Sequence, residues 1–326
     1  MPKISVIIVN YNTAALTIEA ANSVLALCAP HHDLDIHIVE NASGQDDAAR
    51  LLEMARTPAW AERVIIYPET TNHGFGRGNN VALNALAARE TPPEFVFLLN
   101  PDAMMKNDAI GAMRAFMDRH PKAAIAGARA YKPGEDTPES AAFRFHSVFS
   151  VFSSALAIGP WTRLFAHRKV VLDADIDTQK VDWVSGAAVF ARFEVLREIG
   201  FFDPEYFLYF EEVDLMRAAT KAGWECWHVA EAEIIHIQGA VTGVKSSYRG
   251  KPRRPAYWYQ SWSYYFLKNH GRGYALACAA AWVAGAVLNR IVSIIWRKGY
   301  STPQRFFHDF WAMAIRPLLG LSARPY

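Results

Sequence analysis

A strand-like apolar segment followed by a helical segment recurs four times in the first 118 residues, and this alternation limits the possible folds most strongly. The strand-like segments are residues 4–9, 34–39, 64–67 and 95–99, and helical segments follow at residues 13–27, 45–55, 77–88 and 108–118. Strands that alternate with helices pair in parallel, because each helix carries the chain back to the same end of the sheet. The sequence therefore predicts an open, mostly parallel α/β sheet with helices on both faces.

The middle of the chain is less regular. Residues 131–180 contain several prolines and glycines without a clear period, and we expect a long, partly ordered excursion across the sheet there. Regular patterns return as strands at residues 181–190, 225–229 and 233–236 and as helices at residues 192–199 and 211–222. From about Tyr257 onward the chain is helical in character.

Charge divides the chain into two parts. The formal net charge is only +2, yet residues 245–326 hold 13 Lys and Arg against a single acid, Asp309, which gives this tail a net charge of +12 and the first 244 residues −10. We therefore predict two parts with different partners, residues 1–244 and a basic, aromatic-rich helical tail at residues 245–326.

The tail is expected to lie on an anionic membrane surface. Its cations alternate with Trp, Tyr and aliphatic residues, which suits a lipid interface better than nucleic acid. The apolar run at residues 274–288 is interrupted by Asn289 and Arg290, so lying in the interface is favoured over spanning the bilayer. The alternatives are a soluble helical domain that packs its aromatic residues internally, or a homodimer interface.

Cysteines and the first residues bear on the compartment. Cys28, Cys226 and Cys278 lie far apart without a C-x-x-C pair, so neither a zinc site nor a disulfide framework is indicated. Residues 1–9 enter an apolar strand without a secretory signal. These features predict a cytoplasmic protein, peripheral on the inner face of the cell membrane.

Ligands of open α/β sheets bind beyond the carboxyl ends of the strands, which directs attention to residues 10–12, 40–41, 72–80 and 100–102. Residues 72–80 are rich in glycine and stand between a strand and a helix, where backbone N–H groups favour phosphate. Tight-turn geometry alone is the alternative. An NAD site is disfavoured, because a dinucleotide fingerprint belongs in the first turn, and residues 10–12 hold no glycine.

Five acidic or imidazole residues, at three places in the chain, could carry chemistry. Asp102 follows an apolar strand, where a carboxylate suits a divalent cation held partly by substrate phosphates, although it could also cap a helix. Glu211, Glu212 and Asp214 open a helix, where carboxylates also stabilise the helix dipole. His236 could be an ordinary buried histidine.

In their order along residues 4 to about 240, these segments resemble the inverting family 2 glycosyltransferases, most closely their bacterial rhamnosyltransferase branch. Further matching segments lie at residues 182–187, 201–204, 206–215 and 222–224, whereas residues 264–271 of the tail match only loosely. The resemblance implies the GT-A nucleotide-diphosphosugar transferase fold, here with a helical C-terminal extension.

The resemblance also implies roles for single residues. Asp102 takes the last position of a metal-binding D-x-D motif, with His236 near the same Mn²⁺ or Mg²⁺ or the diphosphate, and Glu212 takes the position of the base. Glu211 would cap the helix or position the acceptor. The donor site would be formed by Asn10, Asn12, Glu40, Asn41, Gly74, Phe75, Asn79 and Asn100, with Trp183 and Gly186 shaping the sugar and acceptor site.

Two positions depart from the family pattern. Asn100 replaces the first acid of D-x-D, and Glu212 stands where the family usually has Asp. They support one alternative, a catalytically decayed, membrane-docked nucleotide-sugar binding protein. The other alternative is a nucleotidyltransferase, which would usually show a basic glycine-rich loop after its first strand, a loop that this sequence lacks.

The function expected from the resemblance is sugar transfer to a hydroxyl group. Rhamnose from dTDP-rhamnose is the first choice of donor and a UDP-sugar the second, and the acceptor is a lipid-linked or surface glycan. Inverting transfer needs one base, whereas a glycoside hydrolase would need two carboxyl groups that flank the bond.

Overall fold

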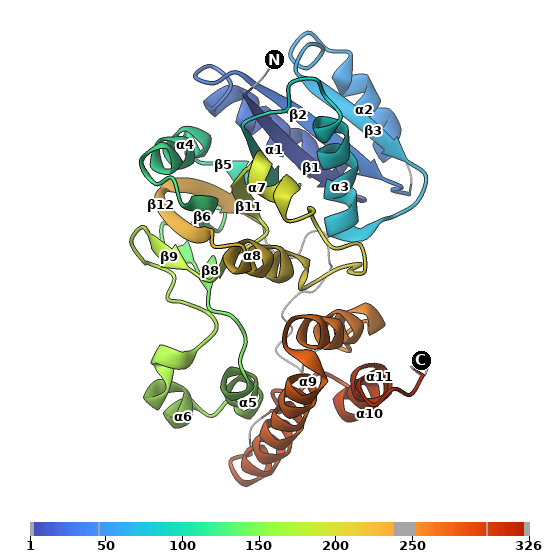
Figure 1. Cartoon of the computed structure of the whole chain (residues 1–326), viewed down its shortest axis with the longest axis vertical. Helices are drawn as coiled ribbons and strands as arrows, with labels where there is room; N and C mark the ends of the chain where they lie inside the picture. Colours follow the sequence, from blue (N-terminus) through green and yellow to red (C-terminus); the bar gives the residue numbers. More distant parts are fainter. Residues whose placement is uncertain (1–2, 45, 238–251, 298, 323–326) are drawn as a thin grey trace. The chain divides into compact units, whose positions relative to one another are not determined.

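The computed structural model describes residues 3–44, 46–237, 252–297 and 299–322 (Figure 1). The chain divides into two compact units. The first unit comprises Met1–Phe143, Val171–Phe207 and Glu211–Gly243, and the second comprises Arg144–Val170, Leu208–Phe210 and Val244–Tyr326. The domain boundary predicted after residue 244 falls outside the described residues and stays a prediction.

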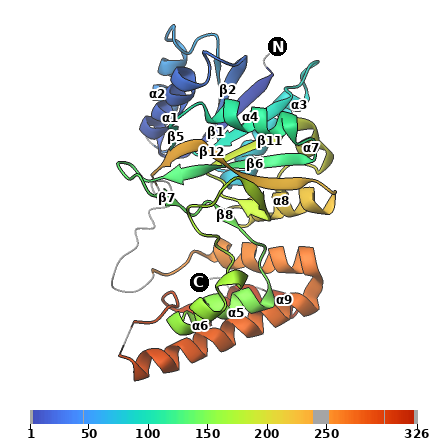
Figure 2. The same cartoon turned by 90° about the vertical axis from the view of Figure 1, so that its left-hand side faces the viewer.

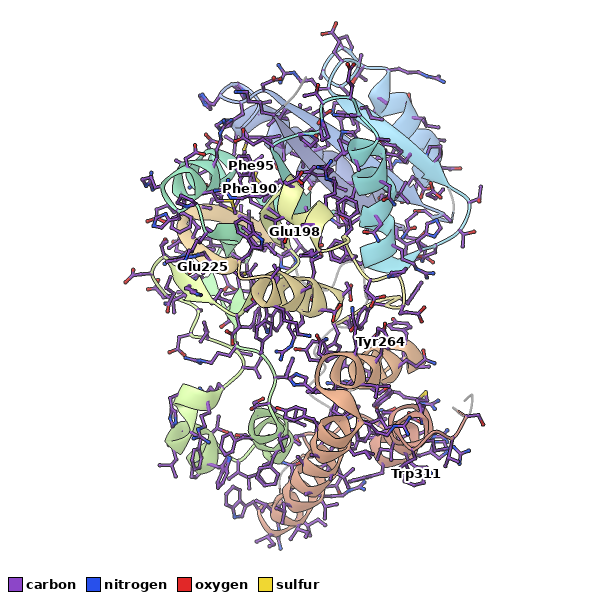
Figure 3. The ribbon with its side chains drawn as sticks, in the orientation of Figure 1. Phe95, Phe190, Glu198, Glu225, Tyr264 and Trp311 are labelled. Atoms are coloured by element: carbon purple, nitrogen blue, oxygen red, sulfur yellow. The ribbon has the colours of Figure 1, made fainter. Side chains whose placement is uncertain are left out.

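In the described part of the first unit, ten strands form one sheet. Its order is β3 (Val64–Glu69), β2 (Leu34–Asn41), β1 (Ile4–Asn10), β4 (Phe95–Leu99), β11 (Ala188–Arg192), β6 (Ala123–Tyr131), β12 (Glu225–His236) and β5 (Ala103–Met105), with β7 (Pro138–Glu139) beside β6 and β9 (Gln179–Val181) beside β12. Strands β3, β2, β1 and β4 are parallel, as predicted. Strand β11 runs antiparallel to both of its neighbours, β4 and β6. Stacking of Phe95 on Phe190 at 4.9 Å joins β4 to β11 (Figure 3).

Helices cover both faces of this sheet, which confirms the expected architecture (Figure 2). Alternate residues of a strand point to opposite faces. Ile8 of β1 therefore joins a core with α1 (Ala14–Leu27), α2 (Asp47–Ala55) and α4 (Ala109–Arg119), while Ile7 joins a core with α3 (Gly74–Ala87), α7 (Phe193–Glu198) and α8 (Glu211–Lys221).

The parallel strands bring their carboxyl ends to one edge of the sheet. Asn10 of β1 lies opposite Glu40 of β2, and Ile8 lies opposite Leu99 of β4. The segments that follow these strands therefore meet at one place, as the sequence predicted.

Three expectations about secondary structure are corrected. Helix α3 begins at Gly74, so most of the glycine-rich segment is helical rather than a loop. The expected strand at residues 181–190 is divided among β9, β10 (Trp183–Val184) and β11. Strand β10 pairs with β8 (Ala142–Phe143) in a separate two-stranded sheet. The two short strands predicted near residue 230 form the single strand β12, whose register shifts between Val229 and Glu233.

The irregular segment after residue 131 also contains helices. These are α5 (Val148–Leu156), α6 (Gly159–Leu164) and the 3₁₀ turn Ala166–Arg168, and all belong to the second unit. Ser147 and Ser150 form a reciprocal capping box at the start of α5. The sequence reading missed this signal, because the usual partner in a capping box is Glu or Gln rather than Ser.

The tail is helical, as expected. It contains α9 (Ala256–Ile295), α10 (Phe306–Phe310), the π-helical turn Trp311–Ile315 and α11 (Arg316–Leu318). Gly271, with φ of 81°, divides α9 into two helical segments. Among the described helices, α9 alone is long and apolar enough to cross a membrane, and 33% of its most apolar stretch is buried.

Helix α9 packs closely on α5. A Cβ atom at Gly285 would lie 2.6 Å from the carbonyl oxygen of Phe152, so only glycine permits this approach. Asn289 is buried, donates to the carbonyl of Leu156 and accepts from the amide of Ser301. The polar residue that interrupts the apolar run therefore has a packing role.

Candidate active site

Asp102 and His236 form one part of the site in the first unit. Strand β5 pairs antiparallel with β12, with Ala103 opposite His236, and this register brings the His236 Nε2 atom to 3.3 Å from the Asp102 Oδ1 atom. Asp102 is buried, and its Oδ1 atom has no hydrogen-bond partner among the described residues.

This pair fits a divalent cation. A buried carboxylate oxygen without a hydrogen-bond partner is costly unless a ligand satisfies it. Mg²⁺-type ions are often held by one or two protein carboxylates, with the remaining positions filled by phosphates and water. No group of three or more His, Cys, Asp or Glu residues suited to a metal occurs in the described part of the chain. Asp102 and His236 would therefore need a phosphate-bearing ligand to complete the coordination.

The predicted residues at the end of β1 hold the neighbouring loop. The buried Asn10 side chain donates to Ser43 and Asp47 and accepts from Thr13 and Thr17. These contacts use both the amide and the carbonyl of the side chain, so Asn10 orders the strand end, and its predicted place in the donor site stays a prediction.

Asn12 and Glu40 act on the same loop. Asn12 has φ of 56°, and its side chain accepts from the Gly44 amide, whereas the buried Glu40 accepts from the Ser43 amide. The two side chains thus bind successive backbone amides of the loop after β2. Of the two, only Asn12 is exposed to solvent.

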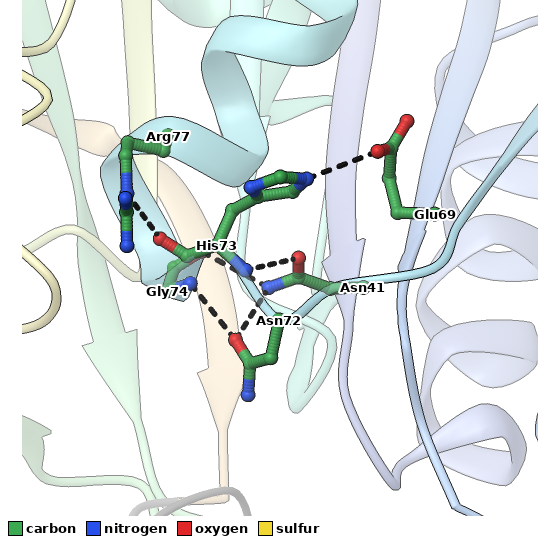
Figure 4. A network of polar contacts seen from close by, with 6 residues as sticks. All are labelled: Asn41, Glu69, Asn72, His73, Gly74 and Arg77. Carbon is green, nitrogen blue, oxygen red and sulfur yellow. Dashed lines mark hydrogen bonds and ion pairs between the residues drawn. The ribbon is translucent and has the colours of Figure 1, made fainter.

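A second network fixes the start of α3 (Figure 4). The Asn41 side chain donates to the Asn72 side chain and to the Gly74 carbonyl, and it accepts from the His73 amide. The Gly74 amide donates to Asn72, and the Phe75 amide donates to the Phe207 carbonyl. Protein oxygens therefore already occupy three of the N–H groups that the sequence assigned to phosphate, those of His73, Gly74 and Phe75.

Gly74 is required by a close approach. Its φ is 76°, and a Cβ atom there would lie 1.8 Å from the carbonyl oxygen of Phe207. This glycine therefore brings the chain before the acidic cluster against α3. The buried Asn79, five residues further along α3, donates its side-chain amide to the Phe75 carbonyl.

Phe75, Gly186 and Glu212 come together from three distant parts of the sequence. A Cβ atom at Gly186 would lie 3.7 Å from the Phe75 ring and 4.0 Å from the Cβ atom of Glu212. Nearby in the sequence, Trp183 stacks on Phe143 at 4.0 Å, and the Asn100 amide donates to the Ala187 carbonyl. The predicted sugar-site segment therefore lies beside the predicted base.

Glu211 and Glu212 form a coupled pair at the start of α8. Burial, followed by the charge of Glu212, holds the pKa of Glu211 well above its ordinary value, and burial raises the pKa of Glu212. The Oε2 atom of each side chain is buried without a hydrogen-bond partner among the described residues. Two adjacent carboxyl groups of this kind titrate as a pair, in which one keeps its proton more easily than the other.

The backbone just before this pair is strained. Tyr209 and Phe210 have φ of 71° and 69°, a left-handed conformation that costs non-glycine residues about 1–3 kcal/mol each. Strain of this size persists only where surrounding structure enforces it. The direction in which Glu211 and Glu212 leave the loop is therefore fixed by the fold.

The chain matches "Glycosyl transferase family 2" over residues 5–200, more than half of its length. The chain belongs to this family. Membership confirms the predicted resemblance, and the matched residues 5–200 are called the family 2 domain below.

Curated relatives of this family 2 domain include rhamnosyltransferases. An "N-acetylglucosaminyl-diphospho-decaprenol L-rhamnosyltransferase" of Mycobacterium tuberculosis is 26% identical over 214 residues, which cover 62% of this chain and 66% of that protein. "Rhamnosyltransferase WbbL" of Escherichia coli is 24% identical over 166 residues, 50% of this chain and 61% of that protein. The matches thus span less than two thirds of either relative.

Solved structures share the fold. GalNAc-T7 crystallised with UDP, GalNAc and Mn²⁺ has a TM-score of 0.58 at 12% identity, covering 100% of this chain and 52% of that one. The mannosyltransferase PcManGT of Pyrobaculum calidifontis, in complex with GDP-Man and Mn²⁺, has a TM-score of 0.55 at 15% identity, covering 98% and 88%. The family 2 domain therefore has the predicted GT-A fold.

The sequence reading missed several residues that shape the site of the family 2 domain. Ser43 and Asp47 bind Asn10, and Asp47 also accepts from the Ala14 amide at the start of α1. Asn80 donates to and accepts from the backbone of Phe202, 122 residues away. Asn80 lies within α3, and Ser43 and Asp47 follow β2. The local sequence around these residues gave no indication of their partners, which are distant in the chain.

Proposed function

We propose that the chain is an inverting glycosyltransferase of the hexosyl type. It transfers a sugar, with rhamnose as first choice, from a dTDP- or UDP-linked donor to a hydroxyl group of a lipid-linked or surface glycan. Family membership supports sugar transfer, and the names of both relatives support rhamnose. The name of the mycobacterial relative also supports a diphospholipid-linked acceptor.

The observation that carries the proposal is the position of Glu212 beside Gly186 and Phe75. In a one-step displacement, the acceptor hydroxyl attacks the anomeric carbon as one base removes its proton, and the bond to the diphosphate breaks. We assign the base to Glu212, which is more exposed than Glu211. Burial raises the pKa of Glu212, which makes it a stronger proton acceptor than an ordinary carboxylate.

Glu211 supports this base. It is 3% exposed, and both burial and the charge of Glu212 favour its protonated form. A protonated Glu211 leaves the negative charge of the pair on Glu212. A protonated carboxyl group can also donate a hydrogen bond, which would help to hold the acceptor oxygen.

Asp102 and His236 would hold a divalent cation, Mn²⁺ or Mg²⁺, together with the donor diphosphate. When bound, such an ion neutralises the charge that develops on the leaving diphosphate. Asn100 would supply no negative charge to the cation, because the oxygen of an amide side chain is neutral. Asn12, Glu40, Asn41, Gly74, Phe75 and Asn79 would form the nucleoside side of the donor site, with Trp183 and Gly186 on the sugar and acceptor side.

We further propose that the tail binds the inner face of the cell membrane peripherally. Large apolar side chains in the second unit are 43–69% exposed, namely Val287, Leu288, Ile291, Ile294, Ile295, Trp296, Trp311, Leu319 and Leu321. Trp311 is labelled in Figure 3. Apolar side chains combined with a tail charge of +12 suit an anionic lipid surface. A homodimer that covers the same apolar residues is the competing occupant.

The purified chain should be incubated with dTDP-rhamnose, UDP-sugars and Mn²⁺, with a short-chain diphospholipid N-acetylglucosamine as acceptor. We expect a glycosylated product whose new bond has the anomeric configuration opposite to that of the donor. Formation of a diphosphosugar from a nucleoside triphosphate would instead indicate a nucleotidyltransferase. Donor binding without any turnover across the panel would indicate a binding protein.

A further inference from the structure

The second unit contains a pocket of about 230 Å³ that the proposed mechanism does not use. Its walls include Trp258, Trp262, Trp282, Phe210 and His146, with Arg254 as the one cationic side chain of the lining. Sites that enclose a whole drug-sized ligand typically measure about 300–1,000 Å³. This pocket would therefore take the head of a larger molecule and leave the rest outside.

The aromatic walls form one continuous cluster. The rings of Trp258 and Trp282 are 5.3 Å apart, those of Trp262 and Trp282 are 5.2 Å apart, and Phe210 packs edge-on against Trp258 at 5.7 Å. Aromatic rings held in this way offer a rigid apolar surface at little cost in conformational entropy.

Arg254 makes the pocket selective for negative charge. Its guanidinium lies 3.7 Å from the centre of the Trp258 ring and 5.6 Å from that of Trp282. Burial lowers its pKa, which reflects the cost of holding a cation away from water. Stacking uses the flat face of a guanidinium, whereas phosphate binds along its edge, so the two contacts are compatible. A cationic head group is disfavoured, because Arg254 already occupies the aromatic faces.

The other groups around the pocket do not oppose an anion. Burial lowers the pKa of His146 to about 4, so this residue is neutral near pH 7. The described residues that line the pocket include no carboxylate. Asp309, the one acid of the tail, accepts hydrogen bonds from the Nε and Nη2 atoms of Arg253 at 2.7 and 2.8 Å, and it does not line the pocket.

We propose that this pocket binds the phosphate end of the acceptor lipid, a phosphate or diphosphate ester of a hydrocarbon chain. The phosphate contacts Arg254, and the first carbons of the chain lie against Trp258, Trp262 and Trp282. This inference rests on the proposed function and names the substrate class of its acceptor. Phe210 lines the pocket and directly precedes Glu211 in the chain.

The test is calorimetric titration of the full chain with farnesyl diphosphate below its micellar concentration. Farnesol, inorganic pyrophosphate and dihexanoyl phosphatidic acid serve as comparisons. We expect farnesyl diphosphate to bind at least roughly tenfold more tightly than farnesol or pyrophosphate, because only it satisfies both the cation and the aromatic walls. Arg254→Gln should reduce its affinity to about that of farnesol.

Two further variants guard against loss of folding. Ser154 is an exposed residue of the pocket lining, so Ser154→Phe should fold normally yet weaken farnesyl diphosphate binding by obstruction. Arg290→Gln is the matched control, since Arg290 stacks on Tyr300 at 4.9 Å outside the pocket. This control should bind like the wild type.

The proposal would be overturned if the wild type and both pocket variants bound farnesyl diphosphate with equal affinity. It would also be overturned if phosphatidic acid bound as tightly as farnesyl diphosphate, because the pocket would then be a site for bilayer phospholipid. Binding and turnover of the nucleotide-sugar donor by the wild type are measured separately. If the donor is turned over while farnesyl diphosphate does not bind, the pocket proposal alone fails. If the lipid binds as expected while no donor is turned over, the pocket proposal is supported and the proposed function fails.

Discussion

The Nε2 atom of His236 lies 3.3 Å from the Oδ1 atom of Asp102, although the two residues are far apart in the chain. The antiparallel pairing of β5 with β12 sets this distance, because Ala103 lies opposite His236. The same Asp102 oxygen has no hydrogen-bond partner among the described residues. Geometry and burial thus leave a carboxylate oxygen and an imidazole side by side at the proposed donor site.

Asp102→Asn should weaken Mn²⁺ binding in the presence of dTDP and lower turnover, because a hard cation prefers an anionic oxygen. Mn²⁺ binding is measured by electron paramagnetic resonance, which does not depend on catalysis. His236→Ala should show a milder defect of the same kind. Asp173→Asn, at an exposed position, is the control. Wild-type Mn²⁺ binding by Asp102→Asn would remove this residue from the cation site.

Gly74→Ala should lower the stability of the fold, whereas Gly186→Ala should change the KM for a substrate and keep the stability. A Cβ atom at Gly74 would meet the Phe207 carbonyl at 1.8 Å in a left-handed conformation, so this variant should unfold at a clearly lower temperature. At Gly186 the added atom makes ordinary contacts of 3.7 and 4.0 Å, so stability should be kept while the KM for donor or acceptor rises. Calorimetry and steady-state kinetics test both. Unchanged kinetics of Gly186→Ala would place the sugar elsewhere.

Glu211→Gln should flatten the dependence of stability on pH. The pKa of Glu211 is raised in the folded protein from an ordinary value of 4.5, so the folded state holds the proton more tightly. This contribution to stability is full below the unfolded pKa and is lost as the pH rises through the folded pKa. The wild-type free energy of unfolding should therefore fall more than that of Glu211→Gln as the pH rises above the ordinary value of 4.5.

Glu198→Gln is the control for this comparison, since Glu198 is exposed and accepts from the Trp224 indole at a distance from the pair. Denaturant unfolding at several pH values measures all three proteins. Parallel curves for the wild type and Glu211→Gln would show that the folded state does not raise the pKa of this carboxyl group.

The chain should bind phosphatidylglycerol vesicles more tightly than neutral vesicles at low salt, and added salt should weaken this preference. Replacing Ile294 and Ile295 with Ser, at positions 65% and 69% exposed, should reduce vesicle binding without changing the melting temperature. Leu52→Ser, at a position 40% exposed in α2, is the control. If vesicle binding depends neither on lipid charge nor on these substitutions, the tail is not the part of the chain that binds the membrane.

The sequence predicted what depends on local pattern. Alternating apolar segments such as residues 4–9 fix the strands, and their carboxyl ends fix where Asn41 and Asp102 must lie. It could not predict that Gly74 is pressed against the Phe207 carbonyl, because that contact joins residues 133 positions apart. Likewise, Arg254 appears in the sequence as one more basic residue, and only folding places it over Trp258.

Transfer of the sugar to acceptor by Glu212→Gln tests the central claim most directly. Glutamine keeps the shape of the side chain but cannot take up the proton, so the rate of transfer should fall by roughly two to four orders of magnitude. Donor binding, measured by titration with dTDP-rhamnose, should be nearly unchanged. If Glu212→Gln retains near wild-type transfer while Glu211→Gln abolishes it with donor binding intact, Glu212 is not the base.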